Sequence, residues 1–121
     1  HRLVNQNMDM VLYIAGDGPY KSNLVQLIKK LDLENHVVFL GLLSSNQMVT
    51  FYKSVDLVIL PSRHEAFGLV FIEAVALGTT VLVSSQFGSL SFIDSEQFDI
   101  DTFVFNPYNC DDLVKKMTNL I

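Results

Sequence analysis

Short apolar segments alternate with helical patterns along almost the whole of this 121-residue chain. The apolar runs are rich in β-branched residues and predict strands at residues 10–15, 36–40, 56–60, 80–84 and 102–105. They are apolar on both alternating positions, which is typical of strands buried on both faces of a parallel sheet. Helical patterns occupy residues 20–33, 46–54, 68–77 and 110–121. This alternation predicts βαβ units and a three-layer α/β fold.

The length and composition suit one small globular domain. Half of the residues are hydrophobic, which supplies a core at the usual domain size of about 100–150 residues. No internal repeat or low-complexity tract is visible. The chain begins without a methionine or a signal-peptide core. We therefore expect residues 1–121 to be a single partial domain cut from a longer protein.

Charge and cysteine content exclude several classes of function. The net charge is −5, from eight basic and thirteen acidic side chains, so a nucleic-acid partner is not expected. The lone Cys110 excludes an internal disulfide and a multi-cysteine metal site. No apolar run reaches the roughly 18–20 residues of a membrane span. These features favour a reducing, cytoplasmic setting.

Four loops are predicted to lie on one rim of the sheet, because ligands of such folds bind outside the carboxyl ends of the strands. These loops are residues 16–18, 41–44, 61–68 and 84–89. The turn at Gly16 and Gly18 is a candidate anion contact, although a plain strand-to-helix turn is the better interpretation of these residues alone. It lacks the GxGxxG spacing of dinucleotide sites, and a Walker A loop is also missing.

The segment from Glu65 to Glu73 crosses a predicted strand-to-helix junction. The backbone amides of Gly68, Leu69 and Val70 would lie in the first helical turn, where they lack partners and carry the positive end of the helix dipole. Such amides form a seat for an anion. Helical side chains tilt toward the N-terminus, so the Glu73 carboxylate would lean toward this seat and could accept hydrogen bonds from a diol.

Three other interpretations of the segment stay open from the residues alone. The two acids could be ordinary surface side chains of a helix. They could also be the acid and nucleophile of a glycosidase, although both belong to one helix start rather than to the two sides of a cleft. A generic flavodoxin-like module would have both acids facing away from a shared cleft. No histidine pair has metal-ligand spacing, so a metal site is not expected, and no serine lies in a GxSxG elbow.

Taken together, these motifs resemble the C-terminal, donor-binding domain of the retaining group 1 glycosyltransferases, which have the Rossmann-like GT-B fold. The two glutamates with seven residues between them match the E-x7-E motif of that family. The resemblance spans nearly the whole chain, in the same order and register, through residues 12–19, 37–41, 55–62, 65–74, 78 and 103–107.

The resemblance implies a role for each matching residue. Glu65 would act as the catalytic contact to the donor sugar, and Glu73 would hold the ribose of a nucleotide-sugar donor. No cofactor or metal is implied, because these enzymes usually work without one. The remaining donor contacts would come from Gly16, Gly18, Leu42, Leu43, Arg63, Phe67, Gly68, Leu69 and Val70.

The chain also departs from the family pattern. Phe87-Gly88 replaces a usual Gly-Gly pair, and Ser91 replaces a usual Glu, which puts donor contacts near those residues in doubt. The family's diphosphate-clamping Arg and Lys lie in an earlier unit, before residue 1. These changes keep an alternative open, in which the protein is a non-catalytic GT-B paralogue serving as a partner subunit or binding module.

The implied partners follow from the same resemblance. The parent enzyme would use a nucleotide-sugar donor and would bind a carbohydrate or lipid-linked acceptor through an N-terminal domain that this chain lacks. A position at the inner membrane face, with peripheral membrane association, is compatible with such an acceptor. The missing first strand predicts an exposed sheet edge, a rearranged strand order, or oligomerisation through that edge.

Overall fold

The computed structural model describes residues 1–120, and the chain forms two compact units, residues 1–48 and 49–121. Each unit contains one parallel sheet, the first of two strands and the second of three. The predicted parallel α/β class is therefore confirmed. Among the described residues, the strands form three parallel ladders, one in the first sheet and two in the second.

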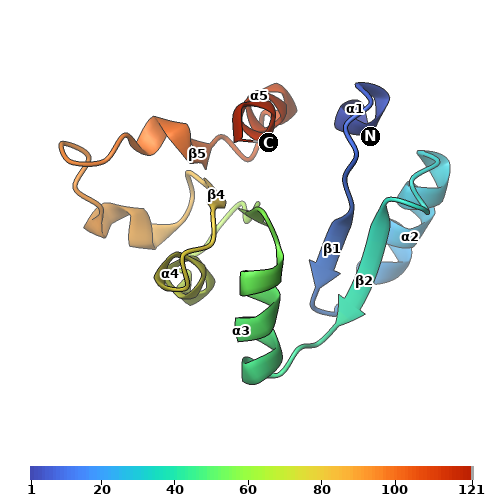
Figure 1. Cartoon of the computed structure of the whole chain (residues 1–121), viewed down its shortest axis with the longest axis horizontal. Coiled ribbons are helices and arrows are strands. Elements are labelled where there is room, and N and C mark those ends of the chain that lie inside the picture. Colours follow the sequence, from blue (N-terminus) through green and yellow to red (C-terminus); the bar gives the residue numbers. More distant parts are fainter. Residues whose placement is uncertain (121) are drawn as a thin grey trace. The chain divides into compact units, whose positions relative to one another are not determined.

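The first unit is a βαβ unit preceded by a short helix (Figure 1). Its elements are α1 (Arg2–Asn5), β1 (Leu12–Ala15), α2 (Lys21–Lys30) and β2 (Val37–Gly41). The two strands pair in parallel, with Leu12 opposite Val37. Helix α2 ends at a Schellman motif, in which the Leu33 amide donates to the Ile28 carbonyl at 3.0 Å. Asp32 adopts the left-handed conformation there, with φ of 54°, so the helix is shorter than the predicted span 20–33.

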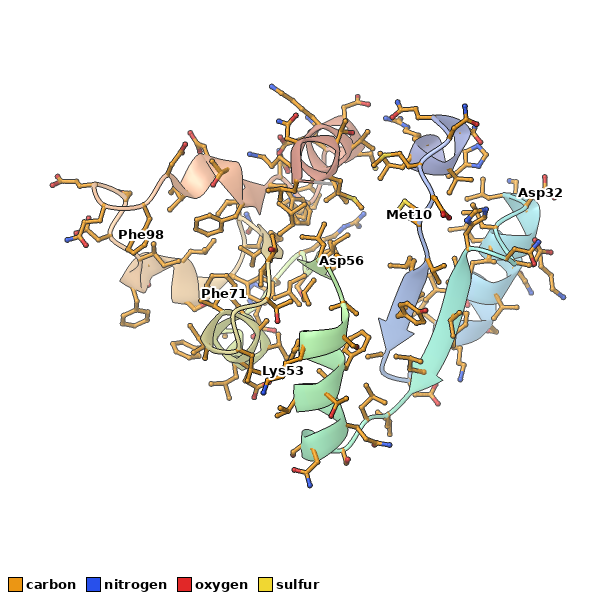
Figure 2. The ribbon with its side chains drawn as sticks, in the orientation of Figure 1. Met10, Asp32, Lys53, Asp56, Phe71 and Phe98 are labelled. Atoms are coloured by element: carbon orange, nitrogen blue, oxygen red, sulfur yellow. The ribbon has the colours of Figure 1, made fainter. Side chains whose placement is uncertain are left out.

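The second unit is built around the central strand β4 (Val81–Ser84), which pairs with β3 (Val58–Leu60) on one side and β5 (Val104–Phe105) on the other. Helix α3 (Ser45–Ser54) leads into this unit. Figure 2 labels Lys53 and Asp56, which mark the end of α3 and the turn toward the sheet. The elements that follow are β3 (Val58–Leu60), α4 (Leu69–Ala76), β4 (Val81–Ser84), the 3-10 helices η1 (Gly88–Phe92) and η2 (Ile100–Thr102), β5 (Val104–Phe105) and α5 (Cys110–Leu120).

The core of the second unit lies between β4 and the helices. All four residues of β4 are buried, and Leu82 and Val83 have no exposed surface. Phe71, labelled on α4 in Figure 2, is buried and stacks on Phe103 with ring centroids 6.4 Å apart. Burial of both faces of β4 confirms its predicted pattern. Helix α4, which carries Glu73, packs against this buried strand.

Three features differ from the predictions. Burial on both faces is wrong for β1, where Leu12 and Tyr13 are 43% and 45% exposed, because β1 pairs with only one strand, β2, in a two-stranded sheet. Helices α1 and η2 were not predicted, since each is a single short turn without a periodic pattern. The last predicted helical residue, 121, lies outside the described residues. Within residues 1–120, no helix is long and apolar enough to cross a membrane.

Candidate functional site

The candidate site is built on the loop that joins β3 to α4. Strand β3 ends at Leu60 and α4 begins at Leu69, so the predicted strand-to-helix junction is confirmed. Gly68 precedes the helix in the left-handed conformation, with φ of 86° and ψ of 65°. A residue with a side chain adopts this backbone region at a cost, whereas glycine does not. The glycine therefore turns the chain sharply into α4.

Hydrogen bonds fix this loop to the segment that follows β4. The Glu65 amide donates to the Gln86 carbonyl at 3.2 Å, and the Gly88 amide donates back to the Glu65 carbonyl at 3.0 Å. These two bonds form a short parallel bridge between Glu65 and Phe87. A third bond runs from the Ser89 amide to the Phe67 carbonyl at 2.9 Å. The backbone around Glu65 is consequently bonded to the segment after β4 in the way that neighbouring parallel strands are.

Two glycines allow the loop and this segment to meet. A Cβ on Gly88 would collide with the Ala66 carbonyl oxygen and lie 2.8 Å from its carbonyl carbon. A Cβ on Gly68 would lie 2.5 Å from Cε1 of Phe87. Phe87 itself is only 4% exposed. Its ring thus packs beneath the loop, and does not project into solvent at the rim.

The two residues that depart from the family pattern have structural roles here. Phe87 fills the space beside Gly68, and Ser91 donates from Oγ to the Gly88 carbonyl at 2.8 Å, within η1. Each substitution is therefore accounted for by a local contact, the packing of Phe87 or the hydrogen bond of Ser91 within η1. Neither one requires that an activity has been lost.

The carboxylate of Glu65 lies close to its own loop. The Phe67 amide donates to Glu65 Oε1 at 3.4 Å, a long bond for this pair of atoms. Glu65 is half-buried, whereas the Phe67 side chain is 44% exposed and lies edge-on to Phe92, with ring centroids 5.9 Å apart. The second carboxylate oxygen of Glu65 remains available to a ligand.

The first turn of α4 presents free backbone donors. Within residues 1–120, the first amide of this helix with an intramolecular acceptor is that of Phe71, which donates to the Gly68 carbonyl at 3.0 Å. The amides of Leu69 and Val70 precede it, and no side chain caps them. They combine unpaired donors with the positive end of the helix dipole, the arrangement that favours an anion.

Glu73 lies on α4, about one turn beyond these amides, and its side chain is exposed. The Tyr52 hydroxyl donates to its Oε2 at 3.4 Å. Burial raises the pKa of Tyr52, and the neighbouring Glu73 carboxylate raises that pKa further. The sequence analysis missed Tyr52, because nothing in an apolar helical pattern marks one tyrosine as the partner of an acid 21 positions away.

Arg63 is exposed, and it is held beside the loop by an aromatic ring. Its guanidinium carbon lies 5.5 Å from the ring centroid of Tyr108, close enough for a cation–π interaction. The Tyr108 hydroxyl also donates to the Arg63 carbonyl at 3.5 Å. The predicted cation is thus tied to the loop between β5 and α5.

The other predicted contacts belong to the first unit. Gly16 and Gly41 pair across a bridge, with the Gly16 amide 2.7 Å from the Gly41 carbonyl oxygen. This brings the predicted turn at Gly16 and Gly18 next to the segment that contains Leu42 and Leu43. Leu42 is 81% exposed, whereas Leu43 is half-buried.

Histidines and acids do not gather into a metal site in the part of the chain that the structure describes. His36 bonds through Nδ1 to the Met10 carbonyl oxygen at 3.1 Å, which is a structural contact in the first unit. His64 is exposed beside Glu65.

Comparison with known proteins gives the family. The model of the glycosyl transferases group 1 matches residues 1–121. An uncharacterized glycosyltransferase of Methanocaldococcus jannaschii is 41% identical over 96 residues, which is 79% of this chain and 25% of the relative. The sulfoquinovosyl transferase of Arabidopsis thaliana is 34% identical over 106 residues, 88% of this chain and 20% of the relative.

Solved structures agree with the fold. The Anabaena protein HepE, solved in complex with UDP and glucose, superposes with a TM-score of 0.75 at 27% identity, over 87% of this chain and 29% of that one. The chain spans 25% of the length of the Methanocaldococcus jannaschii relative and 20% of the length of the Arabidopsis thaliana relative. Because the family model covers every residue of the chain, this protein belongs to the group 1 glycosyl transferases, of GT-B fold.

Proposed function

We propose that this chain is the donor-binding part of a glycosyltransferase, which transfers a sugar from a nucleotide-sugar donor to a carbohydrate or lipid-linked acceptor with retention of configuration. One observation carries the proposal. The uncapped amides of Leu69 and Val70 lie between two carboxylates, Glu65 on the fixed loop and Glu73 along α4. An anionic diphosphate with a sugar on one side and a ribose on the other has the matching order of groups.

The proposed chemistry is mostly electrostatic. The bond between the anomeric carbon and the diphosphate oxygen breaks, and negative charge grows on the departing diphosphate. The acceptor oxygen forms the new bond to the anomeric carbon, and its proton passes to the departing diphosphate. The amides of Leu69 and Val70 would stabilise that charge because they are already oriented and need no rearrangement. Arg63 would add a positive charge near the loop. Glu65 would contact the donor sugar, since its backbone is fixed on both sides by hydrogen bonds.

The remaining contacts belong to the nucleotide. Glu73 would accept hydrogen bonds from the ribose hydroxyls, and Gly68 would let the diphosphate approach the backbone. We assign Phe67 to the sugar side of the site, next to Glu65.

Support for this assignment comes from the family and from one structure. The chain matches the group 1 family over its full length, and the similar Anabaena protein was solved with UDP and glucose. The glycosidase interpretation is weaker, because both carboxylates flank one helix start and the backbone donors between them suit an anion.

Calorimetric titration of the whole protein with UDP and GDP tests the proposal. We expect one of the two to bind, and Glu73→Ala to weaken that binding by about tenfold, the equivalent of about 1.4 kcal/mol. Lys29→Ala is the matched control, since it removes a charge from the exposed end of α2. Nucleotide binding that is indifferent to Glu73→Ala would contradict the ribose assignment, and no binding of either nucleotide would contradict the function.

A further inference from the structure

A buried tyrosine on α3 contacts the carboxylate that we assign to the ribose. Tyr52 is 3% exposed, and its hydroxyl lies 3.4 Å from Oε2 of Glu73. Glu73 itself is exposed on α4. The hydroxyl of the buried Tyr52 therefore contacts the carboxylate of the exposed Glu73.

The tyrosine is anchored to α4 at a second point. Its main-chain carbonyl accepts a hydrogen bond from Thr79 Oγ1 at 2.8 Å. The Thr79 amide in turn donates to the Ala74 carbonyl at 3.1 Å, in the motif that ends α4. The main chain of Tyr52 is thus bonded to Thr79, just beyond α4, and its hydroxyl is bonded to Glu73 on α4.

We infer that Tyr52 is a positioning residue, which holds the Glu73 carboxylate in the orientation that accepts hydrogen bonds from a ribose. This inference rests on the function proposed above. A carboxylate has two oxygens with about four acceptor sites. The tyrosine hydroxyl occupies one site on Oε2, and Oε1 stays open to a ligand diol.

Holding the carboxylate in advance lowers the entropic cost of binding. A free glutamate on a helix surface samples several rotamers, and a ligand that selects one of them loses affinity. The Tyr52 hydroxyl restricts that choice before the ligand arrives. Because burial and the nearby carboxylate raise the pKa of Tyr52 above its ordinary value, the hydroxyl keeps its proton at neutral pH and remains a donor.

A purely structural role of Tyr52 would give a different pattern of ligand affinities when its hydroxyl is removed. Buried tyrosine hydroxyls usually need a partner, and Glu73 could serve only as that partner. In that case, loss of the hydroxyl would affect all ligands equally. If Tyr52 acts through Glu73, its loss should matter only for ligands that carry ribose hydroxyls.

The experiment compares a nucleoside diphosphate with its 2′,3′-dideoxy analogue on the whole protein. Whichever of UDP or GDP binds more tightly is titrated calorimetrically, together with its dideoxy form. We expect Tyr52→Phe to weaken binding of the ribonucleotide about three- to tenfold, and to leave the dideoxy analogue unchanged. Tyr13→Phe is the matched control, because it removes a hydroxyl from a tyrosine that is 45% exposed on β1.

A double-mutant cycle completes the test. In a Glu73→Ala background, adding Tyr52→Phe should change ribonucleotide affinity by less than about twofold, because the partner carboxylate is already gone. Equal weakening of both nucleotides by Tyr52→Phe, or no weakening of either, overturns the positioning role. If Glu73→Ala removes the preference for ribose hydroxyls while Tyr52→Phe does not, only the inference about Tyr52 fails. A ribose preference that survives Glu73→Ala overturns the ribose assignment together with the inference about Tyr52. A wild-type protein that binds neither nucleotide overturns the proposed function itself.

Discussion

Ser84, at the end of β4, donates a hydrogen bond from Oγ to the main-chain carbonyl of Ser62 at 2.5 Å. The same oxygen accepts a bond from the Gln86 amide at 3.0 Å. Ser84 has no exposed surface. One buried hydroxyl therefore joins the strand end, the loop before Glu65 and the turn after β4.

Replacing Ser84 with Ala should destabilise the protein. It would leave the Ser62 carbonyl and the Gln86 amide without their partner, and an unsatisfied group of this kind costs about 1–3 kcal/mol. Urea unfolding measures the loss as a decrease in the free energy of unfolding. Ser85→Ala is the matched control, because Ser85 is exposed and next in sequence.

Replacing Ser89 with Ala should leave the free energy of unfolding unchanged or increase it, in contrast to Ser84→Ala. Ser89 is as buried as Ser84, yet its hydroxyl has no hydrogen-bond partner among the described residues. Removing an unpaired buried hydroxyl removes a desolvation penalty of about 1–3 kcal/mol. The small loss of packing at the same position offsets part of this gain in stability. The same unfolding experiment compares the two serines. Destabilisation by Ser89→Ala as large as that by Ser84→Ala would contradict this account.

Adding one methyl group at Gly88 should disrupt the site. The new Cβ would collide with the carbonyl oxygen of Ala66, and backbone atoms cannot swing aside as a flexible side chain can. We expect Gly88→Ala to destabilise the protein by about 1–3 kcal/mol, as overpacking does, and to weaken nucleotide binding. Gly18→Ala is the control for stability, since nothing lies within 4 Å of its added Cβ.

The raised pKa of Tyr52 predicts a loss of stability at alkaline pH. Its pKa lies above the ordinary value of 10.0 in the folded protein, because of burial and the nearby Glu73 carboxylate. The folded state thus holds this proton more tightly than the unfolded state, and the resulting stabilisation is fully present below pH 10.0. It is lost as the pH rises through the folded-state pKa.

Titration of phenolate absorbance can detect this tyrosine. We expect Tyr52→Phe to remove a late-titrating tyrosine from the curve, and to make the free energy of unfolding fall less steeply above pH 10.0 than in the wild type. Tyr20→Phe serves as the comparison, because Tyr20 is 76% exposed. An identical alkaline dependence in wild type and Tyr52→Phe would show that Tyr52 titrates normally.

The helix α5 should depend on Asn109 at its start. The side-chain oxygen of Asn109 accepts hydrogen bonds from the amides of Asp111 and Asp112, at 3.0 and 3.3 Å. Loss of such a cap costs about 0.5–2 kcal/mol. Asn109→Ala should therefore lower the free energy of unfolding by that amount, whereas Asn109→Asp should retain most of it.

Much of the fold could be predicted because it depends on local patterns. The apolar runs placed all five strands, and the glycine at Gly78 marked the end of α4, where φ is 77°. Burial could not be predicted as well, because it depends on the number of neighbours a strand acquires. The runs at β1 and β4 look alike in sequence, yet only β4 is central in its sheet.

The site was predictable in part for the same reason. The helix start at Gly68 and the position of Glu73 follow from spacing along one segment. The contacts of Phe87, Ser84 and Tyr52 depend on residues that are more than fifteen positions apart from their partners. No single-sequence pattern records such pairs. The roles of Glu65 and Glu73 toward a donor remain predictions until ligand binding is measured.

The two ends of α4 give the helix a fixed length. Gly68 packs against Phe87 at its start, and at its end the Gly78 turn leads to Thr79, which is bonded to Tyr52. One residue of helix corresponds to a rotation of about 100° and a rise of about 1.5 Å. An insertion or deletion within α4 would thus turn Glu73 away from Tyr52 while both ends stay in place. The number of residues in α4 therefore sets the position of Glu73. Relatives that keep this chemistry should differ in the side chains of the helix but not in its length.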